Sequence, residues 1–328
     1  MAQRTECSPD MLSALKGANS ILLCTHISPD GDAIGSMLAM GLALRDMGKD
    51  VTMVCDDPVP KMLLFLPGAK DVFPSSALEN QTFDAALALD CAAASRMGDA
   101  QAAFFAAPVT MQMDHHPDNP GYAQYNAVDG DAPAAGCLVW RALKALNVTI
   151  TPAIAQALYC AISTDTGNFR FRNTTPEAFR IMAELLEAGL DLPAVARPIH
   201  VLREEPQVRL LGRAIGNLRL FGDGKCAGMT LRQADYRAAG AKPEHNTAIV
   251  NYALDIPGVE MAYLAEELPD GRIKASLRAQ DPWNVAAIAR KYDGGGHALA
   301  AALRREGTLE EVRDLIENEM LQALEGCP

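Results

Sequence analysis

The chain has 328 residues, of which 49% are hydrophobic and 21% are charged, and its formal net charge is −12. This length allows two domains with separate hydrophobic cores, and the composition is that of an ordinary globular protein. An acidic chain is not expected to bind long nucleic acid through a broad electrostatic surface. A short anionic ligand, held by a few local cations, remains compatible with this charge.

The cysteines and the amino terminus bear on the compartment. The chain has 8 cysteines without a Cys-x-x-Cys pair, and several of them lie in apolar runs. This pattern favours reduced thiols over a disulfide framework. The first ten residues contain no apolar signal core, and no run reaches the roughly 18 apolar residues that a membrane-spanning helix needs. We therefore expect a cytoplasmic protein with no membrane partner.

In the first part of the chain, short apolar runs alternate with helical patterns. The strand candidates are residues 21–25, 51–55, 83–89 and 108–113, and the helix candidates are residues 33–47, 134–146 and 152–163. This alternation is typical of right-handed βαβ units. The sequence therefore predicts an α/β fold with a mostly parallel sheet and flanking helices.

The pattern changes from about residue 190, where prolines interrupt a charged, partly helical segment. Further on, Gly222-Asp223-Gly224 and Pro269-Asp270-Gly271 are hairpin signals between strand-like runs, and Thr308 and Glu311 form a capping box before a closing helix. These features predict a smaller mixed α/β domain. The expected organisation is a first domain over residues 1–189, a helical linker over 190–216 and a second domain over 217–328.

Acidic residues and histidines follow the predicted strands at their carboxyl ends. In an open parallel sheet these ends share one edge, where ligands bind. The residues are His26, Asp30 and Asp32 after the first strand, Asp90 after the third, Asp114, His115 and His116 after the fourth, and Asp165 in a turn after a predicted helix. Any one of the acids is more often a loop residue or a helix cap. Their occurrence at a single edge instead predicts one site, formed by His26, Asp30, Asp32, Asp90, His115 and Asp165.

The chemistry of these side chains favours a pair of metal ions. Four carboxylates in one small pocket repel one another unless cations neutralise them. Imidazole nitrogens combined with carboxylates suit Mn²⁺ or a similar divalent ion. Asp90, central in the expected layout, is the best candidate for a bridging ligand. Two ions about 3.5–4 Å apart can bind the attacking and departing oxygens of an in-line displacement at phosphorus. The set predicts metal-assisted phosphoester hydrolysis.

The second domain offers a candidate anion site. Gly294, Gly295 and Gly296 precede His297, and glycines let the backbone approach a ligand and direct N–H groups at an anion. Arg278, at the end of a strand-like run, has the guanidinium geometry for bidentate phosphate binding. A glycine helix stop and a solvated arginine explain the same residues without a ligand, and both readings stay open at this point.

These motifs together resemble the DHH phosphoesterases. The matching stretches are His26-Ile27-Ser28-Pro29-Asp30-Gly31-Asp32-Ala33-Ile34-Gly35-Ser36, Leu89-Asp90, Asp114-His115-His116 and Thr164-Asp165-Thr166-Gly167-Asn168-Phe169. The second domain resembles the DHH-associated substrate domain through Ser276-Leu277-Arg278 and the glycine run. The length and residues 169–175 are most similar to bacterial nanoRNases that also act as 3′-phosphoadenosine-5′-phosphate phosphatases.

The resemblance implies Mn²⁺-dependent hydrolysis of very short oligonucleotides or nucleotide bisphosphates in a cleft between two domains, with Mg²⁺ or Co²⁺ as substitute ions; it is also compatible with a homodimer. It implies that His26, Asp30 and Asp90 hold one metal and that Asp32, Asp90, His115 and Asp165 hold the other. It further implies that His116 contacts the scissile phosphate as a charge stabiliser or proton donor and that Asp114 orients the histidine pair. Arg278 and His297, with Gly294–Gly296 close by, would hold the phosphate end of the substrate.

The chain departs from the family near the glycine run. Ala302 stands where the family often has glycine, and Asp293 puts an acid just before the run. Both positions bear on substrate preference and neither touches a metal ligand. Other readings are a phosphodiesterase of linear or cyclic dinucleotide messengers (pApA or c-di-AMP), a pyrophosphatase, a thiol-based metal-buffering protein and a non-catalytic nucleotide-binding relative. A decayed relative is expected to have lost a ligand position, and none is missing.

Overall fold

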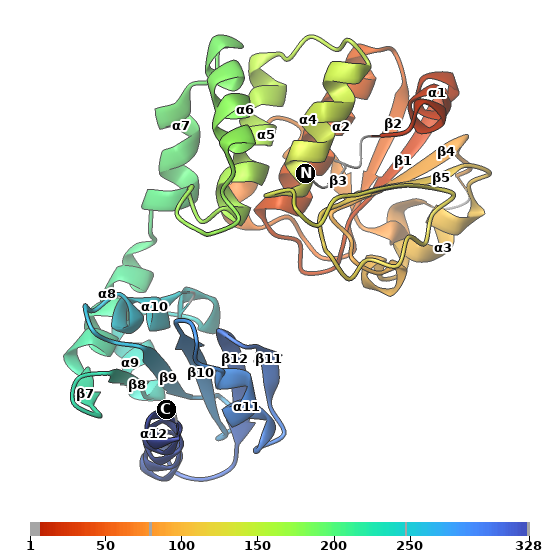
Figure 1. The fold of residues 1–328 in the computed structure, drawn as a ribbon. Coiled ribbons are helices and arrows are strands. Elements are labelled where there is room, and N and C mark those ends of the chain that lie inside the picture. Colours follow the sequence, from red (N-terminus) through yellow and green to blue (C-terminus); the bar gives the residue numbers. More distant parts are fainter. Residues whose placement is uncertain (1–6, 79–80, 247, 327–328) are drawn as a thin grey trace. The chain divides into compact units, whose positions relative to one another are not determined.

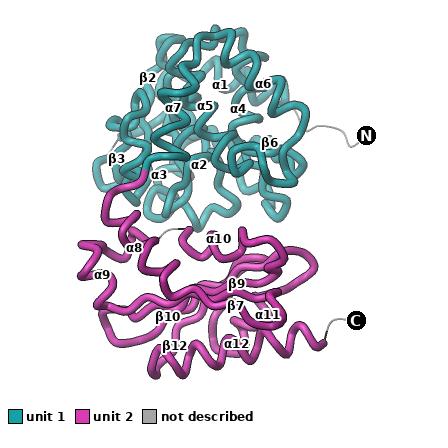
Figure 2. Tube along the Cα trace, turned by 90° about the vertical axis from the view of Figure 1, so that its left-hand side faces the viewer, with its two compact units in different colours: residues 1–202 teal, residues 203–328 magenta. Residues whose placement is uncertain are grey.

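The structure is a computed structural model that describes residues 7–78, 81–246 and 248–326. The chain forms two compact units, residues 1–202 and 203–328, which Figure 2 shows in teal and magenta. Each unit contains its own six-stranded sheet (Figure 1). The boundary between the units falls inside the segment 190–216, which holds α7 (Leu192–Ala196), the π-helix η5 (Arg197–Val201) and α8 (Glu205–Gly216).

The sheet of unit 1 has the strand order β3-β2-β1-β4-β5-β6, and every neighbouring pair is parallel. The strands are β1 (Ser20–Cys24), β2 (Asp50–Val54), β3 (Val72–Phe73), β4 (Ala85–Leu89), β5 (Thr110–Asp114) and β6 (Tyr125–Val128). The parallel sheet predicted from the sequence is thus confirmed. The two edge strands, β3 and β6, were not predicted from the sequence, because they are short and carry exposed or polar residues.

Helices cover both faces of this sheet. They are α1 (Pro9–Gly17), α2 (Gly31–Asp46), α3 (Ala100–Ala106), α4 (Ala135–Ala145), α5 (Pro152–Asp165) and α6 (Pro176–Glu187), with short 3₁₀ turns η1 (Lys61–Leu63), η2 (Ala69–Asp71), η3 (Ser75–Leu78) and η4 (Ala94–Met97). Leu22 and Cys24 point to the α3 face, where Phe104 is buried, and Leu23 points to the opposite face. Because both faces are buried, the central strands β1 and β4 are almost entirely apolar, as in other covered parallel sheets.

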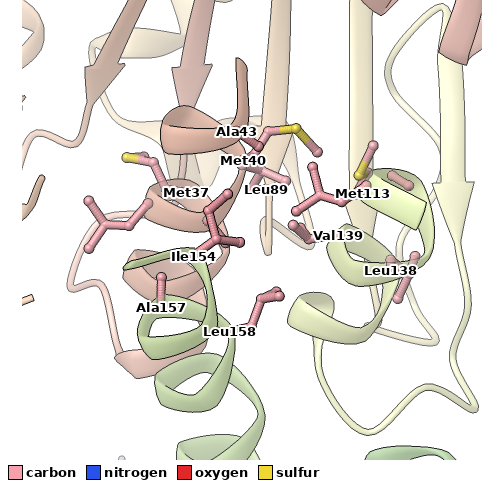
Figure 3. Close-up of a cluster of buried hydrophobic side chains, with 14 of the residues drawn as sticks. Met37, Met40, Ala43, Leu89, Met113, Leu138, Val139, Ile154, Ala157 and Leu158 are labelled. Carbon is pink, nitrogen blue, oxygen red and sulfur yellow. The ribbon is translucent and has the colours of Figure 1, made fainter. Parts of the chain in front are cut away.

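The larger core lies between the sheet and helices α2, α4 and α5. Figure 3 shows Met37, Met40 and Ala43 of α2, Leu138 and Val139 of α4, and Ile154, Ala157 and Leu158 of α5 near Leu89 and Met113 of the sheet. Helices α2 and α5 are in close backbone contact at Gly35, where an added Cβ would lie 2.5 Å from the Ala157 carbonyl oxygen and 2.6 Å from the Ala161 nitrogen. Only glycine fits this contact, and it fixes the helices that carry part of the site described below.

Unit 2 is a mixed sheet with the order β11-β12-β10-β9-β8-β7, in which only the β8–β9 pair is parallel. The strands are β7 (Arg219–Phe221), β8 (Cys226–Leu231), β9 (Met261–Glu267), β10 (Ile273–Ala279), β11 (Gly295–His297) and β12 (Ala300–Arg305). The helices are α8, α9 (Gln233–Ala239), η6 (Pro243–Asn246), α10 (Ile249–Leu254), α11 (Val285–Arg290) and α12 (Leu309–Glu325). The expected smaller mixed domain is confirmed, including the Thr308–Glu311 capping box at α12.

Two observations concern the compartment. Six of the described cysteines, Cys24, Cys55, Cys91, Cys137, Cys160 and Cys226, are buried and form no disulfide, so their thiols pack as small apolar groups. Among the described residues, no helix has both the length and the apolarity that crossing a membrane requires.

We expect Gly35→Ala to destabilise unit 1 because the new methyl group forces α2 and α5 apart. Overpacking of this kind costs about 1–3 kcal/mol. Denaturant unfolding followed by circular dichroism measures the change in the free energy of unfolding.

The matched control is Gly212→Ala in α8, where nothing lies within 4 Å of the added Cβ. Because alanine is the better helix former, this control should be neutral or stabilising by about 0.5–1 kcal/mol. Equal effects of the two substitutions would contradict the close helix contact at Gly35.

Candidate functional site

The histidines and acids that the sequence predicts to converge lie at the carboxyl edge of the unit 1 sheet. His26 follows β1, Asp90 follows β4, and Asp114 ends β5 directly before His115 and His116. Strands β1 and β4 are neighbours, although the chain forms β2 and β3 between them. The site therefore lies where the strand order reverses, which is where open α/β sheets bind ligands.

Asp30 and Asp32 reach the same edge from the first turn of α2. Asp30 is the N-cap of this helix, and its Oδ1 accepts hydrogen bonds from the Asp32 and Ala33 nitrogens at 3.0 and 3.1 Å. The buried Asp32 accepts bonds from the Ala135 and Gly136 nitrogens of α4 at 2.6 and 3.0 Å. Two helix amino termini thus stabilise these carboxylates through their backbone N–H groups. Asp30 is a helix cap and a member of the cluster at once.

The two imidazoles at the centre turn their Nε2 atoms toward carboxylates. His115 Nε2 lies 3.5 Å from Asp90 Oδ1 and 3.7 Å from both Asp32 Oδ2 and Asp165 Oδ2. His26 Nε2 lies 3.6 Å from Asp90 Oδ2. The Nδ1 atoms lie near carbonyl oxygens, at 3.3 Å from Ala132 for His115 and at 2.8 Å from Ile27 for His26. Donation from Nδ1–H to a carbonyl leaves the Nε2 lone pair for a metal ion.

This donor set fits divalent cations. Three overlapping groups of ligand atoms lie within 4.8 Å of one another, namely His26–Asp30–Asp90, Asp32–His115–Asp165 and Asp90–His115–His116. Asp90 Oδ1 is buried and has no hydrogen-bond partner among the described residues. Asp90 also adopts a left-handed backbone with φ of 52°, which is rare for a residue with a side chain. A cation next to Asp90 would satisfy the carboxylate oxygen that the protein leaves unpaired.

Burial and mutual repulsion perturb the acids of the cluster. Burial, followed by the charges of Asp90 and Asp165, raises the pKa of Asp32 well above its usual range. Burial likewise raises the pKa of Asp165 to about 6, against the opposing effect of His115. Both shifts arise because low-dielectric surroundings and neighbouring negative charges disfavour ionisation. Cations bound between these carboxylates would remove the cause of the repulsion.

His116 is held by a chain of buried hydrogen bonds. Its Nδ1 lies 2.8 Å from Asp114 Oδ1, and this bond raises the pKa of His116 to about 9. The fully buried Asp114 accepts a second bond from Asn119 Nδ2 at 2.5 Å. The side chain of Gln112 in β5 in turn exchanges two bonds of 3.1 Å with that of Asn119. The network fixes the orientation of His116 and favours its protonated form.

Sequence reasoning missed several residues that contact the site. Asn119 follows the histidine pair in a loop, and Arg96 comes from η4, with its Nη2 3.2 Å from His26 Nδ1. Asn173 donates to the Asp165 backbone oxygen at 3.1 Å. Only Gln112 offered a signal in the sequence that such a network exists, because a buried amide in an otherwise apolar strand must find a hydrogen-bond partner. The other contacts join segments that no local pattern connects.

The predicted anion-binding residues of unit 2 lie on strands β10 and β11, on either side of β12, with Gly294 just before β11. Ala300 of β12 pairs with Arg278 of β10 on one side and with His297 of β11 on the other. Arg278 is half-buried, its Nη1 donates to the Leu277 carbonyl oxygen, and desolvation lowers its pKa. No ion pair joins it to a carboxylate among the described residues. Its charge is therefore left for another anion.

The glycine run of unit 2 forms the short edge strand β11. A Cβ at Gly294 would lie 2.4 Å from the Ala302 carbonyl oxygen, and Gly296 has φ of +137°. Side chains at these two positions would push β11 away from β12. Nothing crowds Gly295, which pairs with Ala302, and His297 is exposed. The run thus has a packing role that the sequence reading did not include.

Comparisons with known proteins agree with this architecture. Residues 20–162 match the DHH family, N-terminal domain, and residues 227–324 match the DHHA1 domain. The chain is 32% identical over 320 residues to the bifunctional oligoribonuclease and PAP phosphatase NrnA of Thermus thermophilus, covering 96% of this chain and 94% of that protein. It is 24% identical over 296 residues to the protein of the same name from Bacillus subtilis, covering 89% and 91%.

A solved structure gives the same result for the fold. The crystal structure of an exopolyphosphatase-related protein from Bacteroides fragilis superposes with a TM-score of 0.86 at 26% identity, covering 96% of this chain and 94% of that one. The chain therefore belongs to the DHH family and is a phosphoesterase, which is a class of hydrolase. DHH phosphoesterases depend on metal ions, in agreement with the clusters of acids and histidines at the sheet edge.

We expect Asn119→Asp to lower kcat by about 10–100-fold, the usual effect of losing a partner that orients a functional side chain. The new carboxylate cannot donate to Asp114 and repels it, so the bond that orients His116 weakens. Steady-state kinetics and circular dichroism measure the activity and the fold.

Asn126→Asp is the control, because this residue also contacts Gln112 but does not reach Asp114. Its activity should stay within about twofold of the wild type. A normal kcat for Asn119→Asp would show that the Asp114–His116 pair is oriented without Asn119.

Proposed function

We propose that this chain is a Mn²⁺-dependent phosphoesterase that hydrolyses very short oligonucleotides from an end, and 3′-phosphoadenosine-5′-phosphate (pAp). The similarity to the Thermus thermophilus protein, whose name states both activities, extends over 96% of the chain and so includes both units. The single structural observation that carries the proposal is the buried, unpaired Asp90 carboxylate oxygen at the centre of the cluster. The net charge of −12 agrees with short substrates rather than long nucleic acid.

In this proposal two ions share Asp90. His26, Asp30 and Asp90 would hold the first ion, and Asp32, Asp90, His115 and Asp165 would hold the second. The grouping of these ligand atoms within 4.8 Å supports the assignment, as do the three carboxylates within 3.7 Å of His115 Nε2. When bound, the ions supply a water of lowered pKa and positive charge for the phosphoryl oxygens. The mixed donor set suits Mn²⁺, with Mg²⁺ or Co²⁺ as substitutes.

His116 would act on the phosphate rather than on a metal. Asp114 binds its Nδ1, so Nε2 is free to donate a hydrogen bond or a proton to a phosphate oxygen. The raised pKa of His116 keeps the imidazole protonated at neutral pH, which is the form that stabilises negative charge. Asp114 would thus orient the acid and stabilise its positive charge.

Arg278 and His297, together with the backbone of Gly294, Gly295 and Gly296, would bind the phosphate end of the substrate. The half-buried Arg278 without a carboxylate partner supports this role, since a desolvated guanidinium gains most from a bidentate anion. The exposed His297 and Gly295 lie on the neighbouring edge strand. Recognition of one terminal phosphate would also explain a preference for short substrates.

A turnover panel tests the proposal. The chelator-treated protein should be inactive and should regain activity with Mn²⁺, because the carboxylate cluster needs divalent cations to bind an anionic substrate. The substrates are pAp, pApA, pyrophosphate, and RNA and DNA oligomers from dinucleotides upward. We expect turnover of pAp and of RNA dinucleotides, with rates that fall as length increases. Hydrolysis of pyrophosphate alone, or activity that survives metal removal, would overturn the proposal.

Asp90→Asn should reduce kcat by more than about a hundredfold, because both ions lose their shared ligand. This loss exceeds the effect expected for a residue that only orients a ligand. The metal-free variant should be at least as stable as the wild type, since the substitution removes one charge from a set of repelling acids. Kinetics, metal content and thermal unfolding measure these effects.

The control is Asp71→Asn, an exposed acid that pairs with Arg45 on the surface. It should leave turnover unchanged, because an exposed pair contributes at most about 1 kcal/mol to stability and lies outside the cluster. Near-normal turnover of Asp90→Asn would contradict the shared-ligand assignment.

A further inference from the structure

The segment between α5 and α6, residues 166–174, has an unusual backbone. Gly167, Asn168 and Phe169 are three successive residues with positive φ, at 56°, 58° and 63°. A left-handed conformation costs about 1–2 kcal/mol for a residue with a side chain. The surrounding contacts must therefore hold this loop in place, and strain of this kind tends to occur at functional sites.

Hydrogen bonds fix the loop to the end of α5, where Asp165 lies. Thr166 Oγ1 donates to the Ile162 oxygen at 2.6 Å and accepts from the Phe169 nitrogen at 3.2 Å. The Thr166 carbonyl oxygen accepts from the Arg170 and Phe171 nitrogens, each at 3.0 Å. Asn173, as described above, ties the far side of the loop to the Asp165 backbone. The position of Phe171 is therefore coupled to that of a proposed metal ligand.

The two phenylalanines of this loop have different environments. Phe169 packs against the core of unit 1, and its ring centroid lies 5.3 Å from that of Phe179. Phe171 is 57% exposed. The outer atoms of its ring lie on Gly167, where an added Cβ would be 2.4–2.6 Å from three of them. The fold thus holds an aromatic ring in place without using it to fill the core.

Positive charge accompanies this ring. Arg170 Nε donates to the Gly167 carbonyl oxygen at 2.9 Å, so its guanidinium is fixed at the residue on which the Phe171 ring lies. Arg170 and Arg172 are both exposed. In a chain with a net charge of −12, two arginines beside a cluster of acids form a local exception. An exposed aromatic ring with adjacent cations is the usual arrangement for binding single-stranded nucleotides.

We infer that Phe171 is a stacking platform for a nucleobase of the substrate, with the Arg170 guanidinium beside it to contact the sugar-phosphate. This inference rests on the proposed function, and it names the part of unit 1 that binds the base when the phosphate lies at the metal cluster. The two bases provide most of the apolar surface of a dinucleotide. Stacking of one base therefore contributes a large share of the binding free energy. Because every base has a π-face, the platform selects for the presence of a base and not for its identity.

The test compares dinucleotides with and without bases. Phe171→Ala should lower kcat/KM for pApA by about 5- to 150-fold, the range for loss of one base–aromatic stack. For the same dinucleotide backbone with abasic residues, wild type and variant should have equal kcat/KM. Phe171→Trp should restore the wild-type value for pApA. Phe105→Ala, which removes a ring of 47% exposure from α3, outside the loop, is the control and should leave turnover of both substrates unaffected.

Binding without turnover separates this inference from the proposed function. A non-hydrolysable dinucleotide with 2-aminopurine bases loses fluorescence when a base stacks on Phe171, and Phe171→Ala should abolish part of this quenching. If wild type hydrolyses no nucleotide yet shows quenching that depends on Phe171, the proposed reaction fails and the stacking platform stands. The inference is wrong if Phe171→Ala lowers kcat/KM equally for the dinucleotide with bases and for the abasic one. It is also wrong if Phe171→Ala leaves the fluorescence quenching unchanged. The ring is then a structural contact or a surface for another protein segment.

Discussion

The structure depends on the repulsion among carboxylates held together at a mostly buried sheet edge. Backbone N–H groups at two helix amino termini stabilise Asp30 and Asp32, so part of this charge is compensated within the fold. Asp90 has no such partner among the described residues, and it lies closest to both histidines of the cluster. Peptide dipoles thus stabilise Asp30 and Asp32, whereas the buried oxygen of Asp90 has no such partner and is the oxygen that the proposed cations would satisfy. In the proposed function, that division places affinity for metal at the position where the substrate reacts.

The rest of unit 1 serves to hold this arrangement rigid. The close approach of α2 and α5 at Gly35 joins the helix that begins at Asp30 and Asp32 to the helix that ends at Asp165. The other residues of the proposed ligand set, His26, Asp90 and His115, directly follow strands or come within two residues of a strand end, at positions fixed by parallel pairing. A buried hydrogen-bond network on β5 orients His116 from the opposite side. The side chains of the cluster are thus attached to helix ends and strand ends, where the backbone is constrained and holds them in place.

Much of this was predictable from the sequence, for identifiable reasons. The four inner strands are short apolar runs followed by acids or histidines, so both the sheet and the gathering of His26, Asp90 and His115 could be expected. The contact of Arg96 with His26 could not, because it joins segments that only the folded chain brings together, and that of Asn119 could not, because it depends on the path of an irregular loop. The same applies to strand β11, which exists through its pairing with β12. The glycine run is visible in the sequence, but the sequence does not show that β12 will lie close beside it and leave no room for side chains.

The adjacency of β1 and β4 has a consequence for how the protein is made. Ile21 pairs with Ala85, so the centre of the sheet closes only after the intervening β2 and β3 segment has been synthesised. Asp165 is added later still, at the end of α5. In a nascent chain on the ribosome, the proposed set of metal ligands is therefore incomplete until about half of the chain has been synthesised. In the proposed assignment, binding of both ions by the full ligand set needs the pairing of β1 with β4 and the synthesis of α5, unlike small metal-nucleated domains in which the ion itself drives the chain to fold.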